Sequence, residues 1–251
     1  METPVYPDLK DQCIVITGGA SGIGEALVRA FALQDAYVCF CDVQLEAGRQ
    51  LDVELGEKVS FAHVDLTESS QVISWIADVG TRHETIKALL NNAAQDKRIP
   101  LQETTMEQWD QLMRLNLRAS YLCTQQAVPY MKNNAASVIN FGSINFQLGG
   151  AGLSAYVTAK GGIVAMSRSL ARELGPDNIR VNTLSPGWVM TDKQLQLYVD
   201  DDVKKEIFAD QCVPTLIDPG EIAEVALFLA SGVSRAITGQ NIAADRGWRH
   251  L

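Results

Sequence analysis

No apolar run in the sequence approaches the roughly 18 to 20 residues that a membrane span requires. The first stretch, residues 1–11, also lacks the basic segment followed by an apolar core that marks a signal peptide. These two absences favour a cytoplasmic protein that does not act at a membrane.

Positive charge is scarce as well. The 21 Lys and Arg residues are outnumbered by 30 Asp and Glu residues, and the formal net charge is −9. A negative field of this kind repels phosphate backbones and anionic lipid surfaces. Nucleic acid is therefore disfavoured as a partner, and a small molecule is favoured.

Residues that commonly bind metals are few, with five cysteines and three histidines. The odd number of cysteines and their apolar surroundings favour reduced thiols over a disulfide framework. Cys39 and Cys41 share one face of a predicted strand, but two further ligands are missing beside them. His63, His83 and His250 are scattered along the sequence. We therefore expect no catalytic metal.

Disorder and low-complexity repeats are excluded by composition. Hydrophobic residues make up 47% of the chain, and Gly and Pro together number 19 + 8 = 27 of 251 residues. A chain of this length can bury a sizeable core as one unit. No linker, repeat or charge block divides it, so we expect a single domain over residues 1–251.

Short apolar runs alternate with longer helical patterns throughout the chain. The apolar runs predict strands at residues 13–17, 37–42, 59–64, 88–91, 137–141 and 179–184. The helical patterns predict helices at residues 22–34, 44–55, 69–79, 106–131, 154–174 and 219–229. Strands without hydrophobic alternation, each followed by a helix, indicate a parallel sheet covered on both faces. The predicted fold is α/β, a single doubly wound parallel sheet of the Rossmann type.

One stretch, residues 187–214, is less regular than the rest and is long and polar. We expect it to form a flexible lid over the substrate site. A surface excursion without function is the alternative.

A glycine-rich turn follows the first predicted strand and opens the first predicted helix. Glycines allow a tight turn and let backbone N–H groups approach a pyrophosphate at the positive end of a helix. The strand–turn–helix context therefore indicates a dinucleotide site. The residues expected to contact the cofactor here are Gly18, Ser21, Gly22, Ile23 and Gly24.

An acidic residue, Asp42, ends the second predicted strand, where it can accept hydrogen bonds from the adenosine ribose. Its carboxylate repels a 2′-phosphate, and no Lys or Arg follows until Arg49, so NAD is favoured over NADP. Asp42 could alternatively cap the following helix. Asp65, followed by Leu66, could likewise hold the adenine or cap the helix that begins after Thr67.

A tyrosine and a lysine, Tyr156 and Lys160, stand one helical turn apart and project from the same helix face. An ammonium close to a phenol stabilises the phenolate. This spacing therefore predicts a lowered pKa for Tyr156 and a role in proton transfer.

Together these motifs resemble the short-chain dehydrogenase/reductase family, and the resemblance extends from about Leu9 to Trp248. It rests on the glycine turn, on Asn91-Asn92-Ala93-Ala94, on Ser143, on Tyr156 with Lys160, and on Pro186-Gly187-Trp188-Val189-Met190-Thr191. The family usually has glycine where this chain has Ala94. The resemblance implies an oxidoreductase that transfers hydride between a carbinol carbon and a nicotinamide.

The resemblance also implies roles for individual residues. Ser143 would orient the substrate oxygen, Tyr156 would exchange its proton, and Lys160 would bind the nicotinamide ribose and lower the pKa of Tyr156. Asn116 would hold a water molecule of a proton relay, although a purely structural asparagine within a helix is the alternative. Further cofactor contacts are expected from Asn92, Ala93, Pro186, Gly187, Val189 and Thr191.

The substrate is indicated by more variable segments. The ending Asp245-Arg246-Gly247-Trp248-Arg249 is similar to that of bacterial aldose 1-dehydrogenases, especially those acting on D-xylose. Polar residues and an indole suit a polyhydroxylated substrate, because an apolar one would leave buried polar groups unpaired. The alternative is that Gln147 and Gln194 face solvent. The expected pocket consists of Asp96, Ser143, Asn145, Gln147, Tyr156, Trp188 and Gln194.

These observations predict an NAD-dependent dehydrogenase that oxidises a sugar or a sugar-derived hydroxyl, giving a lactone if the anomeric carbon reacts. The alternatives are a sugar-acid or polyol dehydrogenase, a 3-oxoacyl reductase, and a nucleotide-binding scaffold without catalysis. The predicted helices at residues 106–131 and 154–174 have more apolar surface than packing against one face of the sheet would bury. Because the resembled family commonly packs these helices together, we expect a homotetramer.

Overall fold

A computed structural model describes residues 4–248 of the chain. Arg249, the last residue of the sugar-dehydrogenase-like ending, lies outside the described residues. No helix within residues 4–248 is long and apolar enough to cross a membrane.

A single parallel sheet forms the centre of the fold. Its seven described strands run in the order β3-β2-β1-β4-β5-β6-β7. The order reverses between β1 and β4, which opens a crevice at the carboxyl ends of these two strands. Their bounds are β1 (Cys13–Thr17), β2 (Tyr37–Asp42), β3 (Val59–His63), β4 (Ala88–Asn91), β5 (Ala136–Phe141), β6 (Ile179–Pro186) and β7 (Asn241–Ala244).

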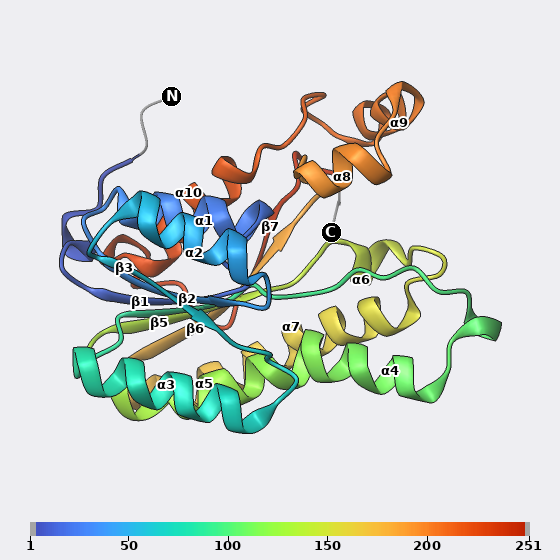
Figure 1. Ribbon diagram of the computed structural model, residues 1–251. Coiled ribbons are helices and arrows are strands. Elements are labelled where there is room, and N and C mark those ends of the chain that lie inside the picture. Colours follow the sequence, from blue (N-terminus) through green and yellow to red (C-terminus); the bar gives the residue numbers. More distant parts are fainter. Residues whose placement is uncertain (1–3, 249–251) are drawn as a thin grey trace.

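Helices cover both faces of this sheet, as Figure 1 shows. On one face lie α1 (Gly22–Ala32), α2 (Leu45–Leu55) and α10 (Pro219–Ala230). On the other lie α3 (Ser69–His83), α4 (Met106–Met113), α5 (Ala119–Met131) and α7 (Ser154–Leu174). The strand residues alternate between two apolar clusters, one under α1 and α10 and one under α3 and α5. The predicted doubly wound fold is confirmed.

The predicted helix over residues 106–131 is not continuous. A π-helical turn, Arg114–Arg118, separates α4 from α5. Asn116 lies in this turn, and both ends of its side-chain amide are bonded to the backbone of Gln95. Local π-helical turns often mark functional sites within helices. The hydrophobic periodicity of residues 106–131 does not indicate this one.

The predicted lid contains two short helices, α8 (Asp192–Leu197) and α9 (Asp201–Asp210). Side-chain caps begin both, because Thr191 accepts a hydrogen bond from the Gln194 N–H and Asp200 accepts from the Val203 N–H. Figure 1 shows α8 and α9 beyond the main layers. The sequence analysis also missed β7 and the four-residue helix α6 (Asn145–Leu148). The other predicted elements are confirmed with ends shifted by a few residues.

A buried chain of polar side chains ties α7 to the sheet. The Asn91 amide in β4 donates to the Asn140 side-chain oxygen in β5 over 2.8 Å. Asn140 in turn donates to the Ser167 hydroxyl on α7 over 2.9 Å. All three residues are almost inaccessible to solvent. These bonds hold α7, which carries Tyr156 and Lys160, in register with the strand ends.

The substitution Asn140→Ala tests this connection. It removes an acceptor from Asn91 and a donor from Ser167, and an unmade buried hydrogen bond costs about 1–3 kcal/mol. We expect the free energy of unfolding, measured by urea titration, to fall by that amount. Gln125→Ala, on the exposed side of α5, should change it by less than about 0.5 kcal/mol. Equal stability of the two variants would contradict this role for Asn140.

Candidate active site

The glycine turn lies where the strand order reverses. Gly18 has a φ of +68°, and a Cβ at this position would lie 2.7 Å from the Cα of Ala93. A Cβ on Gly24 would lie 1.7 Å from the carbonyl oxygen of Gly18. The turn is therefore pressed against the segment after β4 and against its own helix, which requires glycine at both positions.

Thr17 and Asn92 fasten these two loops together. The Thr17 hydroxyl accepts hydrogen bonds from the N–H groups of Asn92 and Ala93, at 3.0 and 3.1 Å. The side-chain amide of Asn92 donates to the carbonyl oxygens of Thr17 and Gly18. Asn92, expected as a cofactor contact, uses its side chain to set the shape of the glycine turn.

Asp42 is buried beside the same turn. One carboxylate oxygen accepts from the Ala20 N–H at 3.1 Å, and the other accepts from the Gln44 N–H at 3.0 Å. A negative charge thus stands next to the turn, whereas the neighbouring Val43 is exposed and apolar. Arg49, the first cation further along the chain, pairs with Glu46 on α2. This electrostatic setting disfavours a 2′-phosphate.

Asp65 and Leu66 serve the local structure after β3. The Asp65 carboxylate accepts from both the N–H and the hydroxyl of Thr67, at 2.9 and 2.7 Å. These bonds stabilise the turn before α3 but do not cap the helix, because its N-cap residue is Glu68 and no side chain caps it. Leu66 is buried in the apolar cluster under α3, so the structure gives its side chain a packing role.

The segment after β6 closes over the glycine turn. Gly187 packs against Asp245, because a Cβ at Gly187 would lie 2.9 Å from the Asp245 Cα. A Cβ at Gly22 would lie 3.1 Å from a methyl carbon of Thr191. Val189 is buried and forms a parallel bridge with Ile217. The structure therefore brings Pro186, Gly187, Val189 and Thr191 to the end of the crevice predicted for the cofactor.

Ser143, Tyr156 and Lys160 meet where β5 ends and α7 begins. The Ser143 hydroxyl lies close enough to the Tyr156 phenol to lower its pKa, and it accepts from the Asn145 N–H at 3.2 Å. The Lys160 ammonium donates to the Phe141 carbonyl over 2.6 Å and lies 5.7 Å from the centroid of the Tyr156 ring. A hydroxyl, a phenol and an ammonium thus converge as the sequence predicted.

The protonation of this group differs from the sequence prediction. Burial raises the pKa of Tyr156 to about 12, against the lowering effect of Ser143, and the charge of Asp96 raises it further. Burial also lowers the pKa of Lys160 to about 8. The predicted lowering of the Tyr156 pKa is therefore wrong for this structure, because desolvation dominates. The Lys160 ammonium is directed to the Phe141 carbonyl.

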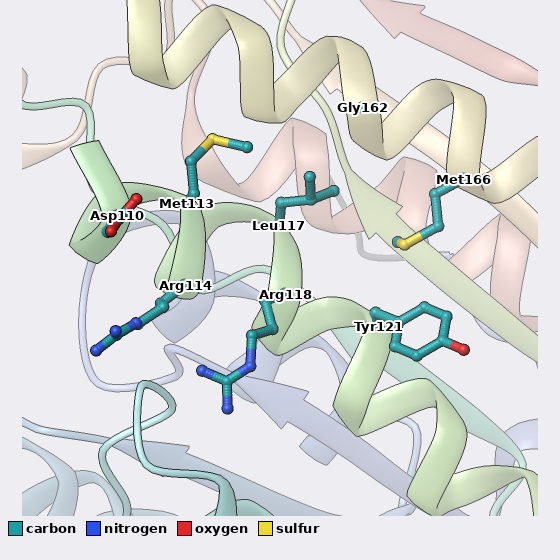
Figure 2. A pocket seen from close by; sticks show the side chains of 8 residues that line it. All are labelled: Asp110, Met113, Arg114, Leu117, Arg118, Tyr121, Gly162 and Met166. Carbon is teal, nitrogen blue, oxygen red and sulfur yellow. The ribbon is translucent and has the colours of Figure 1, made fainter. Parts of the chain in front are cut away.

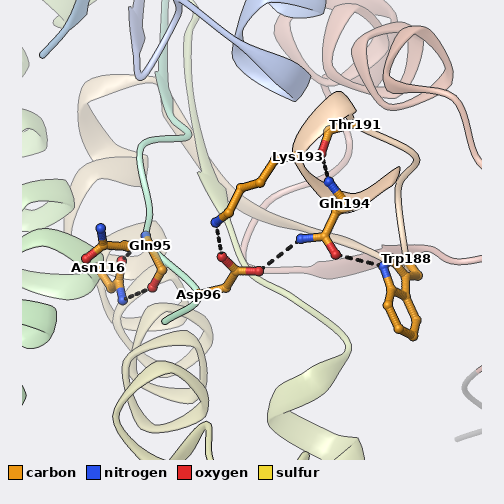
Figure 3. Close-up of polar contacts among 7 residues, drawn as sticks. All are labelled: Gln95, Asp96, Asn116, Trp188, Thr191, Lys193 and Gln194. Carbon is orange, nitrogen blue, oxygen red and sulfur yellow. Dashed lines mark hydrogen bonds and ion pairs between the residues drawn. The ribbon is translucent and has the colours of Figure 1, made fainter. Parts of the chain in front are cut away.

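Asn116 holds the loop that follows β4. Its side-chain oxygen accepts from the Gln95 N–H at 2.8 Å, and its amide donates to the Gln95 carbonyl at 2.9 Å. The asparagine is buried and its amide points to the loop backbone (Figure 3). This paired contact agrees with the structural alternative for the Asn116 side chain, and it places Asp96, the next residue, beside the catalytic group.

Asp96 is the centre of a polar network, drawn in Figure 3. Its carboxylate pairs with Lys193 and accepts from the Gln194 amide at 3.0 Å. The Gln194 side-chain oxygen accepts from the Trp188 indole N–H at 2.9 Å. Burial would raise the pKa of Asp96, but Lys193 and Gln194 hold it below its usual value. Three of the predicted substrate residues therefore form one connected group, which joins the loop after β4 to the segment of residues 187–214.

Other residues depart from the predicted pocket or were missed. Asn145 opens α6 next to Ser143, whereas Gln147 lies exposed further along that helix. Lys193 was missed because its ion pair spans two loops distant in the sequence. Trp248 was noted only as part of the chain ending, and its ring stacks on Trp188 at 6.4 Å between centroids.

Comparison with known proteins agrees with this geometry. A family model described as "Enoyl-(Acyl carrier protein) reductase" matches residues 18–249. The chain belongs to the short-chain dehydrogenase/reductase family of oxidoreductases.

Similar proteins cover almost the entire chain. A D-xylose 1-dehydrogenase of Caulobacter vibrioides is 41% identical over 99% of this chain and 100% of its own. A "Probable galactose dehydrogenase" of Rhizobium meliloti is 36% identical, and the match covers 96% of each chain. A 3-oxoacyl-[acyl-carrier-protein] reductase of Chlamydia trachomatis is 34% identical over 95% of this chain and 98% of its own.

A solved structure also matches over the whole chain. It is titled a short-chain dehydrogenase/reductase, glucose/ribitol dehydrogenase, from Brucella melitensis. It superposes with a TM-score of 0.93 at 25% sequence identity, covering 99% of this chain and 100% of the other. The predicted fold and family are both confirmed.

The lowered pKa of Lys160 predicts a pH dependence of stability. Between pH 8 and 10.5 the unfolded lysine is protonated while the buried one is not, so the unfolded state binds more protons and stability rises with pH. Lys160 contributes at most about 1.4 kcal/mol per pH unit to the slope of the unfolding free energy against pH. Urea unfolding at a series of pH values in this range should show this contribution in the wild type. The contribution should be absent in Lys160→Met.

A matched control is Lys97→Met, which removes an exposed lysine close to the site. This variant should keep the wild-type dependence of the unfolding free energy on pH. An identical slope in Lys160→Met and the wild type would show that the buried ammonium carries no such penalty.

Proposed function

We propose that this protein oxidises a sugar, most readily an aldose at its anomeric carbon to give a lactone, with NAD as hydride acceptor. The observation that carries the proposal is the network of Asp96, Gln194 and Trp188 beside the catalytic tyrosine. The names of the xylose and galactose dehydrogenases among its relatives support the same substrate class.

The polar network suits a polyhydroxylated ligand. The half-buried Asp96 carboxylate and the Gln194 amide can exchange their mutual hydrogen bonds for bonds to several hydroxyls, while the indole of Trp188 covers a sugar face. An acyl chain could form no hydrogen bond with these groups and would displace the water around them, at a cost of about 1–3 kcal/mol for each group left unpaired. This cost disfavours a 3-oxoacyl substrate, although a 3-oxoacyl reductase is among the similar proteins.

The crevice residues fit NAD. The glycine turn keeps its shape because a Cβ at Gly18 or Gly24 would collide with the backbone of Ala93 or of Gly18. The N–H groups at the start of α1, those of Gly22 and Ile23, would face the pyrophosphate. Asp42 would accept hydrogen bonds from the adenosine ribose, and Lys160 would bind the nicotinamide ribose. The segment containing Gly187 and Thr191 would close over the nicotinamide end. When bound, NAD supplies the carbon that accepts hydride.

The chain's own groups would move the proton. Tyr156, as phenolate, would remove the proton of the substrate hydroxyl while Ser143 holds the same oxygen. Lys160, whose pKa of about 8 leaves it charged at neutral pH, would favour the phenolate there, and Asn116 would fix the loop that presents Asp96. The raised pKa of Tyr156 in the ligand-free protein implies faster oxidation at alkaline pH, where more phenolate is available.

The assembly we propose is a homotetramer. A surface hollow of about 530 Å³ lies between the π-helical turn, α5 and α7, and Figure 2 shows Met113, Leu117, Tyr121 and Met166 around it. The hollow is on the outer face of these helices, away from Tyr156. Covering it with the equivalent helices of a second copy would bury apolar side chains that solvent now reaches.

A cytoplasmic location belongs to the same proposal. All five cysteines are free thiols in the described structure, and four of them are buried. Unpaired thiols are typical of a reducing compartment. The supply of NAD in the cytoplasm agrees with this placement.

Formation of reduced cofactor by the purified protein tests the function. We expect turnover of pentoses or other aldoses with NAD, at least about tenfold faster than with NADP because of Asp42. The panel should also contain sugar acids, polyols and a 3-hydroxyacyl ester. Turnover of these alone would keep the family chemistry but reject the aldose proposal.

Tyr156→Phe separates catalysis from binding. Removing the phenol hydroxyl deletes the proton acceptor, so kcat should fall by roughly 10² to 10⁴. NAD affinity, measured by calorimetry, should remain within a few fold of the wild type. Full activity in this variant would reject the mechanism, and absence of activity in the wild type would favour a nucleotide-binding scaffold.

Sedimentation at micromolar protein concentration tests the assembly. The wild type should sediment as a tetramer, and Tyr121→Glu should shift it toward smaller species because a carboxylate would be buried at the interface. Val53→Glu, at an exposed site on α2, is the matched control and should leave the mass unchanged. A wild-type species of only 27.4 kDa would disprove the tetramer.

A further inference from the structure

Two cysteines from neighbouring strands lie close together far from the catalytic group. Cys13 begins β1, whereas the catalytic residues follow the carboxyl ends of the strands. In the parallel register Cys13 pairs with Tyr37, so Cys39, two residues further along β2, projects from the same face of the sheet. Both thiols are buried in the cluster under α3.

A histidine completes this group from the helix above. His83 is the last residue of α3, and its Nε2 atom lies 3.4 Å from the Sγ of Cys39. The ligand atoms of Cys13, Cys39 and His83 all lie within 4.8 Å of one another. The sequence pattern indicates only Cys39 and Cys41 as neighbours, because Cys13 and His83 come close solely through strand register and the end of α3.

The spacing of these atoms matches a tetrahedral metal. With zinc–sulfur bonds of about 2.3 Å and zinc–nitrogen bonds of about 2.05 Å, adjacent ligands stand about 3.6–3.8 Å apart. The observed separation between Cys39 Sγ and His83 Nε2 is 3.4 Å, close to this value, and the Cys13 Sγ lies within 4.8 Å of both atoms. Two thiolates and an imidazole form a donor set that zinc prefers.

Neighbouring groups orient these ligands. The His83 ring packs on Tyr37 with 5.4 Å between centroids, which fixes the direction of its Nε2 atom. The Ser60 hydroxyl donates to the Cys39 sulfur at 3.4 Å. Outer contacts of this kind are typical of metal ligands, whose orientation they fix.

The nearby cations are already neutralised. Lys58 lies over the Tyr37 ring, but its ammonium pairs with Asp11 and Asp35 at 2.6 and 2.7 Å. Arg82 precedes His83 and pairs with Asp78 at 2.9 Å on the exposed side of α3. These pairs reduce the repulsion that a divalent cation would meet at the thiols.

We propose that Cys13, Cys39 and His83 form a binding site for a thiophilic divalent cation of the zinc type. Three protein ligands leave the fourth position to solvent, which can enter beside the half-buried His83. The cation would crosslink β1, β2 and the end of α3. It would also stiffen β2 just before Cys41, whose carbonyl accepts hydrogen bonds from Gly18 and Gly19 of the glycine turn.

Cobalt and zinc titrations of the reduced, chelator-treated, full-length protein test this site. We expect Co²⁺ to bind at one equivalent per chain with a thiolate-to-cobalt charge-transfer band and the intense visible bands of a tetrahedral centre. Zn²⁺ should displace it and raise the melting temperature. These readouts need neither NAD nor a sugar, so failure here would be distinct from failure of the proposed dehydrogenase activity.

His83→Gln is the main variant, because the half-buried helix end tolerates the change and circular dichroism can verify folding. Zinc affinity should fall by at least about tenfold, with the melting shift lost, and Cys39→Ser should abolish the charge-transfer band. Cys212→Ser, which removes an exposed thiol, is the control and should bind as the wild type. Equal zinc affinity in His83→Gln and the wild type, the absence of a charge-transfer band, or a Cys13–Cys39 disulfide in the purified protein would each overturn the site.

Discussion

The close approach of the loops after β1 and β4 is the constraint on which the cofactor crevice depends. Gly18 can lie against Ala93 only because it lacks a Cβ, and the Thr17 hydroxyl binds both backbone N–H groups of the opposite loop. The reversal of strand order creates a space at this point. The glycine turn and Asn92 then shape that space, and the first helix begins directly beside it.

The catalytic group combines burial with hydrogen bonds that a buried charge requires. Lys160 loses hydration on entering the site, and the Phe141 carbonyl restores only part of it. Ser143 offsets some of the burial cost of a Tyr156 phenolate. This group is held by α7, which the Asn140 amide ties to the sheet. Catalytic geometry therefore depends on a polar chain in the core as well as on the residues that react.

The polar network around Asp96 is made by contacts between segments distant in the sequence. Asp96 follows β4, while Lys193 and Gln194 belong to the first lid helix, and Trp188 precedes it. Polar character at Asp96, Trp188 and Gln194 could be predicted from residue type and family resemblance. Their mutual bonds could not, because hydrogen bonding between loops follows from how the lid folds back over the sheet.

The sequence by itself determined the alternation of buried strands and helices, the glycine turn and the spacing of Tyr156 and Lys160, because each depends on local periodicity or adjacent residues. Only the tertiary structure decided the π-helical turn at Asn116, the desolvation that raises the pKa of Tyr156, and the meeting of Cys13 with His83. These features arise from packing between elements far apart in the chain. Burial and strand register depend on the whole fold, so a local sequence pattern cannot predict them.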